Sequence, residues 1–228
     1  KTTYEPIISG TTTESFEDYV VNKIAKYKNY SESQLCDLFG ISYEKKPKNL
    51  EAMLAYKILG IKGNKAEEFE KAGIVVKTIR IGKNNKIKEN MSFPTFKFTE
   101  IINETWENCT FRNYLSNTRF FFVIYKFDEN NELRLKGCQF WNMPYTDLET
   151  DVKKVWCKTC DVIKKGIKVN TVNGRNYNNL PSQSENRICH VRPHGKNSSD
   201  TYPLPNGSAF TKQCFWLNNS YILSQLKI

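Results

Sequence analysis

One segment of the chain has the residue types of a metal-dependent hydrolase. Glu68 precedes the apolar stretch Gly73–Ile81, which is predicted to be a strand and contains Lys77. Nucleases of this kind hold Mg²⁺ with carboxylates and use a lysine to orient or activate the attacking water. Strand side chains alternate, so the acid two residues before the lysine must share its face. That position is Val75, and a hydrocarbon cannot ligate a hard cation. Taken alone, such a segment is most often a buried strand with one exposed lysine.

A second group of residues has the types that bind zinc. Cys157 and Cys160 form a CxxC motif, with Cys189, His190 and His194 downstream. A structural zinc site needs four such ligands brought together. The CxxC falls inside a predicted helix, and no second closely spaced pair completes the set. Seven scattered cysteines are typical of reduced thiols. We expect no metal here, and a zinc-stabilised interaction module remains an alternative.

The overall composition favours a polyanionic partner. The 228 residues carry a formal net charge of +10, which suits nucleic acid, although a solubilising surface would look the same. An aromatic content of 13% argues against disorder. The sequence has no apolar run long enough to cross a bilayer and no signal-peptide core near Lys1. We therefore expect a cytoplasmic piece, without membrane contact, of a longer polypeptide.

The elements that must position these residues alternate between helices and hairpins. Helices are predicted from Ser15, from Ser31, from Asn49 to Gly60, over Thr99–Leu115 and over Asp147–Lys165. Two hairpins are predicted, Gly73–Ile81 with Ile87–Phe93 and Phe120–Phe127 with Leu133–Trp141. Asn170–Asn186 is predicted to be a surface loop. This pattern indicates an α/β (α+β) class.

Several short motifs, in order along the chain, resemble the family of the MutH mismatch-repair nuclease and the Sau-type restriction endonucleases that cut at GATC. The matching pieces are Lys48–Leu54, Glu68-Phe69, Gly73–Ile79, Val191-Arg192-Pro193 and Phe215-Trp216-Leu217. The resemblance implies a MutH-like restriction-endonuclease fold, with a central mixed sheet, flanking helices and a basic DNA cleft. Sau-type enzymes carry two such halves, and this chain resembles the second, non-catalytic one. Residues 1–228 would form one pseudo-nuclease domain whose partner is the N-terminal catalytic half.

Laid on this sequence, the family's catalytic positions fall on Tyr56, Glu68, Val75 and Lys77. Two of three carboxylates are therefore missing. We expect no catalytic residue and no cofactor in this domain, with Mg²⁺ bound only in the catalytic half. The alternative is an active Mg²⁺-dependent endonuclease that recruits a relocated acid, Glu67 or Glu70.

The family's DNA-reading positions fall on Lys48, Asn49, Arg192, Pro193 and Trp216. An arginine fork matches guanine and is the commonest specific contact in the major groove. Trp216 stands where MutH uses a tyrosine to sense adenine methylation, and it lacks the hydroxyl. Without the resemblance, Lys48 and Arg192 would be interpreted as ordinary surface residues, and Trp216 as either a core residue or a DNA contact. The sequence thus predicts sequence-specific binding of GATC-like duplex DNA by an inactive effector half of a type II restriction endonuclease.

Overall fold

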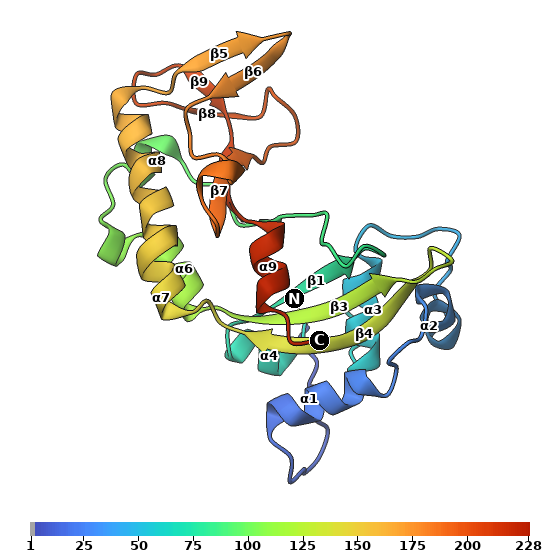
Figure 1. Ribbon diagram of the computed structural model, residues 1–228. Helices are drawn as coiled ribbons and strands as arrows, with labels where there is room; N and C mark the ends of the chain where they lie inside the picture. The colour runs from blue at the N-terminus through green and yellow to red at the C-terminus, as the bar shows by residue number, and fades with distance from the viewer. Residues whose placement is uncertain (1–2) are drawn as a thin grey trace. The chain divides into compact units, whose positions relative to one another are not determined.

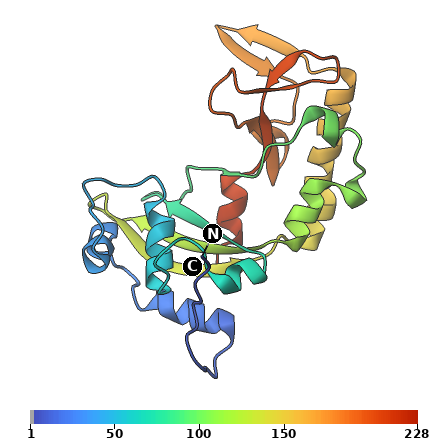
Figure 2. The same cartoon turned by 180° about the vertical axis from the view of Figure 1, so that it is seen from behind.

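The computed structural model describes residues 3–228 (Figures 1 and 2). The chain forms two compact units, each built from separate stretches of sequence. Of the described residues, unit 1 comprises 3–88, 117–142 and 226–228, and unit 2 comprises 89–116 and 143–225. The chain therefore leaves unit 1 after residue 88, returns to it over residues 117–142, leaves it again, and ends in it. The predicted mixed α/β class is confirmed.

Unit 1 is built on a mixed sheet of three strands, which Figure 1 shows in green and yellow. Strand β1 (Ile74–Ile81) runs parallel to β3 (Arg119–Phe127), and β3 runs antiparallel to β4 (Leu133–Trp141). A β-bulge interrupts the second pairing between Ile124 and Tyr125. Strand β3 is the centre of the sheet, and its run Phe120–Tyr125 is buried. A continuous apolar run is what a strand covered on both faces requires.

Helices of unit 1 pack on the sheet face that carries Phe121 and Val123. They are α1 (Phe16–Ala25), α2 (Glu32–Phe39), α3 (Leu50–Ile58) and α4 (Glu67–Lys71). The predicted capping residues work as expected, because Ser15 accepts from the Asp18 backbone N–H and Ser31 forms a capping box with Gln34. This face holds the described hydrophobic core of the unit.

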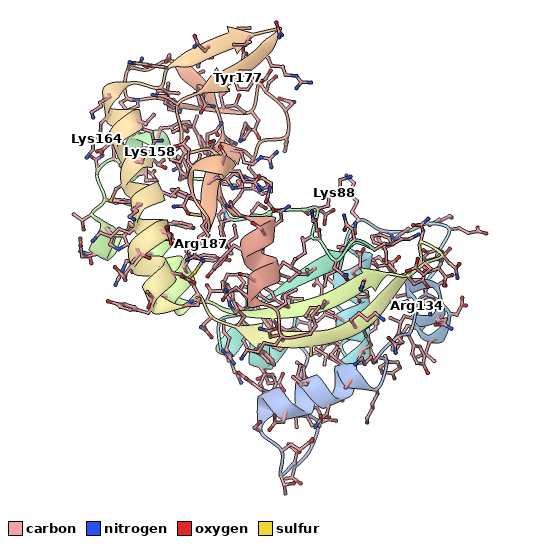
Figure 3. The ribbon with its side chains drawn as sticks, viewed as in Figure 1. Lys88, Arg134, Lys158, Lys164, Tyr177 and Arg187 are labelled. Atoms are coloured by element: carbon pink, nitrogen blue, oxygen red, sulfur yellow. The ribbon has the colours of Figure 1, made fainter. Side chains whose placement is uncertain are left out.

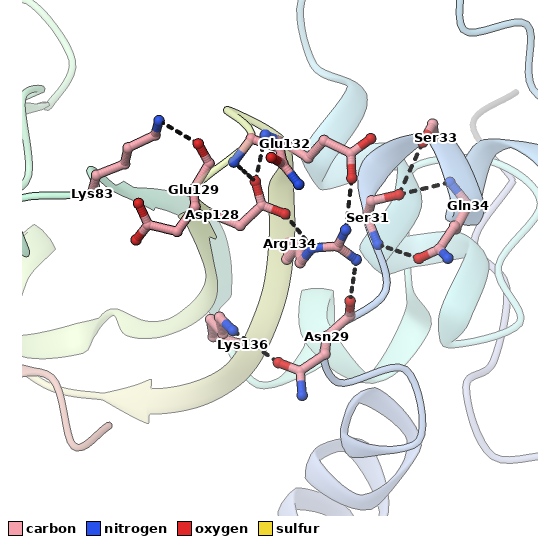
Figure 4. Close-up of polar contacts among 11 residues, drawn as sticks. Asn29, Ser31, Ser33, Gln34, Lys83, Asp128, Glu129, Glu132, Arg134 and Lys136 are labelled. Atoms are coloured by element: carbon pink, nitrogen blue, oxygen red, sulfur yellow. Dashed lines mark hydrogen bonds and ion pairs between the residues drawn. The ribbon is translucent and has the colours of Figure 1, made fainter.

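The turn between β3 and β4 is fixed by charge rather than by apolar packing (Figure 4). Arg134 forms ion pairs with Asp128 at 2.6 Å and with Glu132 at 2.7 Å. The same guanidinium donates a hydrogen bond to the carbonyl oxygen of Asn29, at 3.0 Å. Asn29 also accepts from Lys136 at 2.8 Å. The strand pair is thereby tied to the segment that leads into α2.

Unit 2 contains a second, antiparallel sheet of three strands. Its central strand β10 (Gln213–Leu217) pairs with β7 (Cys189–Pro193) on one side and with β2 (Met91–Ser92) on the other. Phe215 of β10 stacks on Phe111 with ring centroids 4.1 Å apart. The helices and turns of the unit are α5 (Phe98–Ile101), η1 (Trp106–Asn108), α6 (Thr110–Asn117), α7 (Tyr145–Asp147), the π-helical turn η2 (Leu148–Val152), α8 (Lys153–Lys165), η3 (Gln183–Glu185) and α9 (Asn219–Gln225).

Two hairpins complete unit 2. One is formed by β5 (Val169–Val172) and β6 (Arg175–Asn178), the other by β8 (Thr201–Pro203) and β9 (Ala209–Thr211). The first follows α8 directly, as Figure 1 shows in orange. The predicted surface loop over Asn170–Asn186 does lie at the surface over residues 170–179, but the absence of strands was wrong for residues 170–178, because a tight Asn-Gly turn folds them into a ribbon.

The predicted hairpin of Gly73–Ile81 with Ile87–Phe93 was also wrong. Its turn forms, since the Gly82 N–H donates to the Lys86 carbonyl at 2.8 Å, but only the single bridge Ile81–Ile87 follows. Beyond it the chain enters unit 2, and β1 takes β3 as its partner. The parallel strand β3, which is distant in sequence, thus takes the place beside β1 that was predicted for the antiparallel segment Ile87–Phe93.

Candidate functional site

The strand that would hold the catalytic lysine is β1. Val75 and Lys77 alternate with Val76, so they share the face opposite the one on which α3 packs. In the register with β3, Val75 lies opposite Phe120 and Lys77 lies opposite Phe122. Both phenylalanines are buried. The half-buried Lys77 thus has hydrocarbon neighbours where a metal site would need a carboxylate.

Tyr56, on α3, occupies the second missing acid position. Its ring is half-buried against the core of unit 1, with its centroid 6.4 Å from that of Phe69. Burial raises the pKa of the Tyr56 hydroxyl, so the side chain stays neutral over the range in which proteins are folded. The Tyr56 side chain therefore packs against the core of unit 1.

Glu68, the remaining acid, is held by the N-terminal segment of the chain. Its carboxylate accepts backbone N–H groups from Ile7, at 2.9 and 3.0 Å, and from Ile8, at 3.0 Å. Burial acts to raise the pKa of Glu68, but the hydrogen bonds from Ile7 and Ile8 outweigh it and hold this pKa below its ordinary value. The carboxylate is ionised, and its lone pairs are engaged by the backbone.

The four positions therefore do not fit a Mg²⁺ ion. A hard cation requires several oxygen ligands, and here two positions are hydrocarbon or phenol while the third is engaged with backbone N–H groups. The alternative acids are placed no better, since Glu67 is ion-paired with Lys71 and Glu70 lies exposed on α4. Within residues 3–228, no group of three or more His, Cys, Asp or Glu side chains is placed to hold a metal ion.

The cysteine and histidine residues that could bind zinc are dispersed. Cys160 is buried on α8, where burial raises the pKa of its thiol to about 12, and its Sγ donates to the Ile101 carbonyl at 3.7 Å. Cys189 is buried in β7, and burial raises its thiol pKa as well. His190 is buried with its Nδ1 2.6 Å from Asn218 Oδ1, and desolvation lowers its pKa. His194 is exposed and packs edge-on against Trp216.

Lys48 and Asn49 lie at the start of α3, as the resemblance requires. Both are exposed, and Asn49 is the N-cap residue but makes no capping hydrogen bond with its side chain. The first N–H group of the helix is satisfied by the backbone instead, since the Leu50 N–H donates to the Pro47 carbonyl at 3.2 Å. The Asn49 amide is therefore not used by the helix that it begins.

The loop before Lys48 is anchored by a buried carboxylate that sequence reasoning missed. Glu32 is 2% exposed, and its Oε2 lies 2.5 Å from Lys46 Nζ and 3.4 Å from the hydroxyl of Tyr43. The only signal in the sequence was an acid in the first turn of α2. Lys46 and Tyr43 are the loop's two attachments to this acid, so Glu32 fixes the approach to Lys48.

A second buried acid, Glu51, lies close to Glu32. It is 2% exposed and forms an ion pair with Arg80 of β1 at 2.5 Å. Burial raises the pKa of Glu32, Lys46 opposes that rise, and the neighbouring Glu51 adds to it. Each acid thus has its own cation, and the pair connects α2, α3 and β1 beneath the loop.

In unit 2 the structure brings three of the sequence-predicted residues together. Arg192 and Pro193 end β7 and are exposed, and Trp216 is half-buried on the adjacent strand β10. The Arg192 guanidinium lies over the indole ring, 5.4 Å from its centroid, and the Trp216 Nε1 donates to the Arg192 carbonyl at 3.3 Å. The ring of His194 meets the same indole at 5.3 Å. Trp216 is thus a platform for Arg192, whereas its neighbour Phe215 is core.

Comparisons with known proteins agree with the resemblance. Residues 59–153, which include Glu68, Val75 and Lys77, match the family model described as the DNA mismatch repair enzyme MutH. The chain is 36% identical over 253 aligned residues to the type II restriction enzyme Sau3AI of Staphylococcus aureus, an alignment that covers 93% of the chain. The chain spans about half the length of that enzyme, 51%. No helix among residues 3–228 is long and apolar enough to cross a membrane. The family-model match, which includes the strand of Lys77, and the identity to a restriction enzyme together show that the chain is related to the MutH-like family.

Proposed function

We propose that this chain is a catalytically inactive, sequence-specific binder of double-stranded DNA that acts at GATC-like sites. It would serve as the non-catalytic half of a type II restriction endonuclease and cooperate with a catalytic half of the same polypeptide. The observation that carries the inactivity is Val75, which shares a strand face with Lys77 where the metal-binding acid would have to be. Tyr56 and the engaged carboxylate of Glu68 support it.

DNA recognition is supported by the exposed cations at the family's reading positions. Arg192 is exposed and lies over Trp216, an arrangement that limits the guanidinium's rotamers while leaving its N–H groups free to meet a base edge. Its edge could form two hydrogen bonds to guanine O6 and N7. Lys48 and Asn49 would enter the groove from the start of α3. The net charge of +10 would supply the sequence-independent part of the affinity.

Two measurements test this proposal. In a cleavage assay with Mg²⁺ or Mn²⁺, the purified chain should leave a GATC-containing duplex intact, and the Lys77→Ala variant should behave identically. Site-specific cutting that disappears in Lys77→Ala would instead indicate an active site with a relocated acid. In a titration with labelled duplexes, the chain should bind a GATC duplex more tightly than a scrambled one, with affinity falling steeply as salt rises. Absence of duplex binding at low salt would remove the DNA-binding function.

A further inference from the structure

Most arginines of this protein are neutralised by carboxylates. Arg80, Arg112, Arg119, Arg134 and Arg187 each form an ion pair with Glu or Asp, and Figure 4 shows those of Arg134. Among the described residues, the two arginines with no carboxylate partner are Arg175 and Arg192, both in unit 2. Arg192 is the proposed base-reading residue. Arg175 lies in a different element, the β5–β6 hairpin, which no part of the proposed function has used.

The β5–β6 hairpin is fixed in shape by its turn. Asn173 and Gly174 form the two-residue loop with φ of 50° and 73°, the left-handed conformations that a type I′ turn requires. The register pairs Val172 with Arg175 and Asn170 with Tyr177. Directly paired residues share a face, so these four side chains lie on one face of the ribbon. Arg175 therefore lies beside the turn, and Tyr177 lies two pairs further along the ribbon on the same face.

Every residue of this hairpin is exposed to solvent. Val169, Val172 and Tyr177 are 52%, 53% and 54% exposed, which is a large apolar exposure for a two-stranded ribbon (Tyr177 is labelled in Figure 3). An isolated hairpin is marginally stable in water. A ribbon that exposes both its faces and an aromatic ring is suited to contact another molecule.

The positive charge in the sequence around the hairpin favours a negatively charged partner. No acidic residue occurs between Asp161 and Glu185, and the basic residues in that interval are Lys164, Lys165, Lys168 and Arg175. The other side chains of the ribbon are rich in amides. A two-stranded β-ribbon fits the major groove of B-DNA, and a basic one is attracted by its phosphates.

We infer that the β5–β6 hairpin is a second DNA-contacting element, in which Arg175 binds the phosphate backbone of the duplex and Tyr177 lies against the same strand. This inference rests on the proposed DNA-binding function but not on its sequence specificity. Arg192 would supply discrimination, while Arg175 would supply affinity that is independent of sequence.

The experiment measures the affinity of Arg175→Ala for a GATC duplex and for a scrambled duplex across a range of salt concentrations. We expect losses of about three- to tenfold on both duplexes at low salt, and a slope of log affinity against log salt that is shallower by about one. Arg175→Lys keeps the charge and should stay within about twofold of wild type. Because Arg175 is exposed, its replacement should leave the thermal unfolding midpoint unchanged.

The matched control is Lys158→Ala, which removes one positive charge from α8 that is already paired with Glu185. It should change the affinity by less than about twofold. An equal loss in this control would mean that overall charge is responsible, which would overturn the role of the hairpin. Wild-type affinity and slope in Arg175→Ala would overturn it as well, and so would a loss confined to the GATC duplex. If wild type binds neither duplex, the proposed function itself fails.

Discussion

Strand β1 of unit 1 and the β7–β10 pair of unit 2 carry the positions that the resemblance assigns to catalysis and to DNA reading, and the two regions differ in how their charged side chains are held. At β1, Val75 occupies the position beside Lys77 where the resemblance expects an acid. The remaining acid, Glu68, accepts hydrogen bonds from backbone N–H groups. At β7, Arg192 is exposed and forms no ion pair with a carboxylate among the described residues. If the proposed function holds, the comparison teaches that catalytic positions can be taken over by packing and backbone hydrogen bonds while the DNA-reading arginine stays exposed.

The largest expected effect concerns Arg192. Arg192→Ala should lower affinity for a GATC duplex by roughly ten- to a hundredfold, because one bidentate pair with guanine discriminates by about 1–3 kcal/mol. Binding to unrelated duplex should be nearly unchanged, and Arg192→Lys should fall between the two. Competitive binding against matched and scrambled duplexes measures both quantities. Equal losses on the two duplexes would mean that Arg192 contacts phosphate, and would contradict its assignment as a base-reading residue.

The next largest effect concerns Glu68, the acid of unit 1 that remains at a catalytic position of the family. Glu68→Ala leaves the N–H groups of Ile7 and Ile8 without their acceptor, which should lower the free energy of unfolding by roughly 1–3 kcal/mol. Chemical denaturation measures this loss, while DNA affinity should not change. A variant as stable as wild type would show that Glu68 is not structural and reopen its role as a metal ligand.

The pH dependence of unfolding also tests whether the ionised carboxylate of Glu68 stabilises the fold. The pKa of Glu68 is lowered in the folded state, so its contribution is present above the pKa of the unfolded chain and is lost as the pH falls through the lower, folded value. Wild type should therefore lose more stability on acidification than Glu68→Gln, which cannot titrate. Identical acid profiles for the two proteins would contradict this assignment.

The smallest effect concerns Trp216. Trp216→Leu removes the ring over which Arg192 lies, and an exposed cation–π contact is worth about 0.5–1 kcal/mol. Affinity for the GATC duplex should fall by about two- to fivefold, and Trp216→Phe should recover part of that loss. A loss as large as that of Arg192→Ala would mean that the indole contacts DNA directly.

The sequence predicted the parts of the fold that depend on local signals. The polar turn Asp128–Asn131 and the flanking apolar runs predicted the β3–β4 hairpin, and Ser31 with Gln34 predicted the start of α2. It failed where distant segments compete, because β1 pairs with β3 from 45 residues away in the register Ile74–Arg119. It also failed at Asn173-Gly174, where a hairpin signal was present but lay within a stretch poor in aliphatic residues.

The candidate site divided in the same way. Placing Val75 beside Lys77 needed only the alternation of a strand, and the resemblance placed Lys48 and Arg192 on exposed ends of elements. The partners of Glu68 and Glu32 could not be foreseen. Ile7 is 61 residues from Glu68, and no pattern marks a backbone N–H group as a partner. Such contacts depend on the packing of the finished unit.

The position of Trp216 gives this protein a built-in optical reporter. The other three of its four tryptophans, Trp106, Trp141 and Trp156, are 4%, 7% and 5% exposed, whereas Trp216 is half-buried beneath the guanidinium of Arg192. A small quencher in solution should therefore reach one indole and leave the rest of the emission intact. If a base edge binds to the Arg192 guanidinium above this ring, the emission of that single residue should change and report the contact without any attached dye.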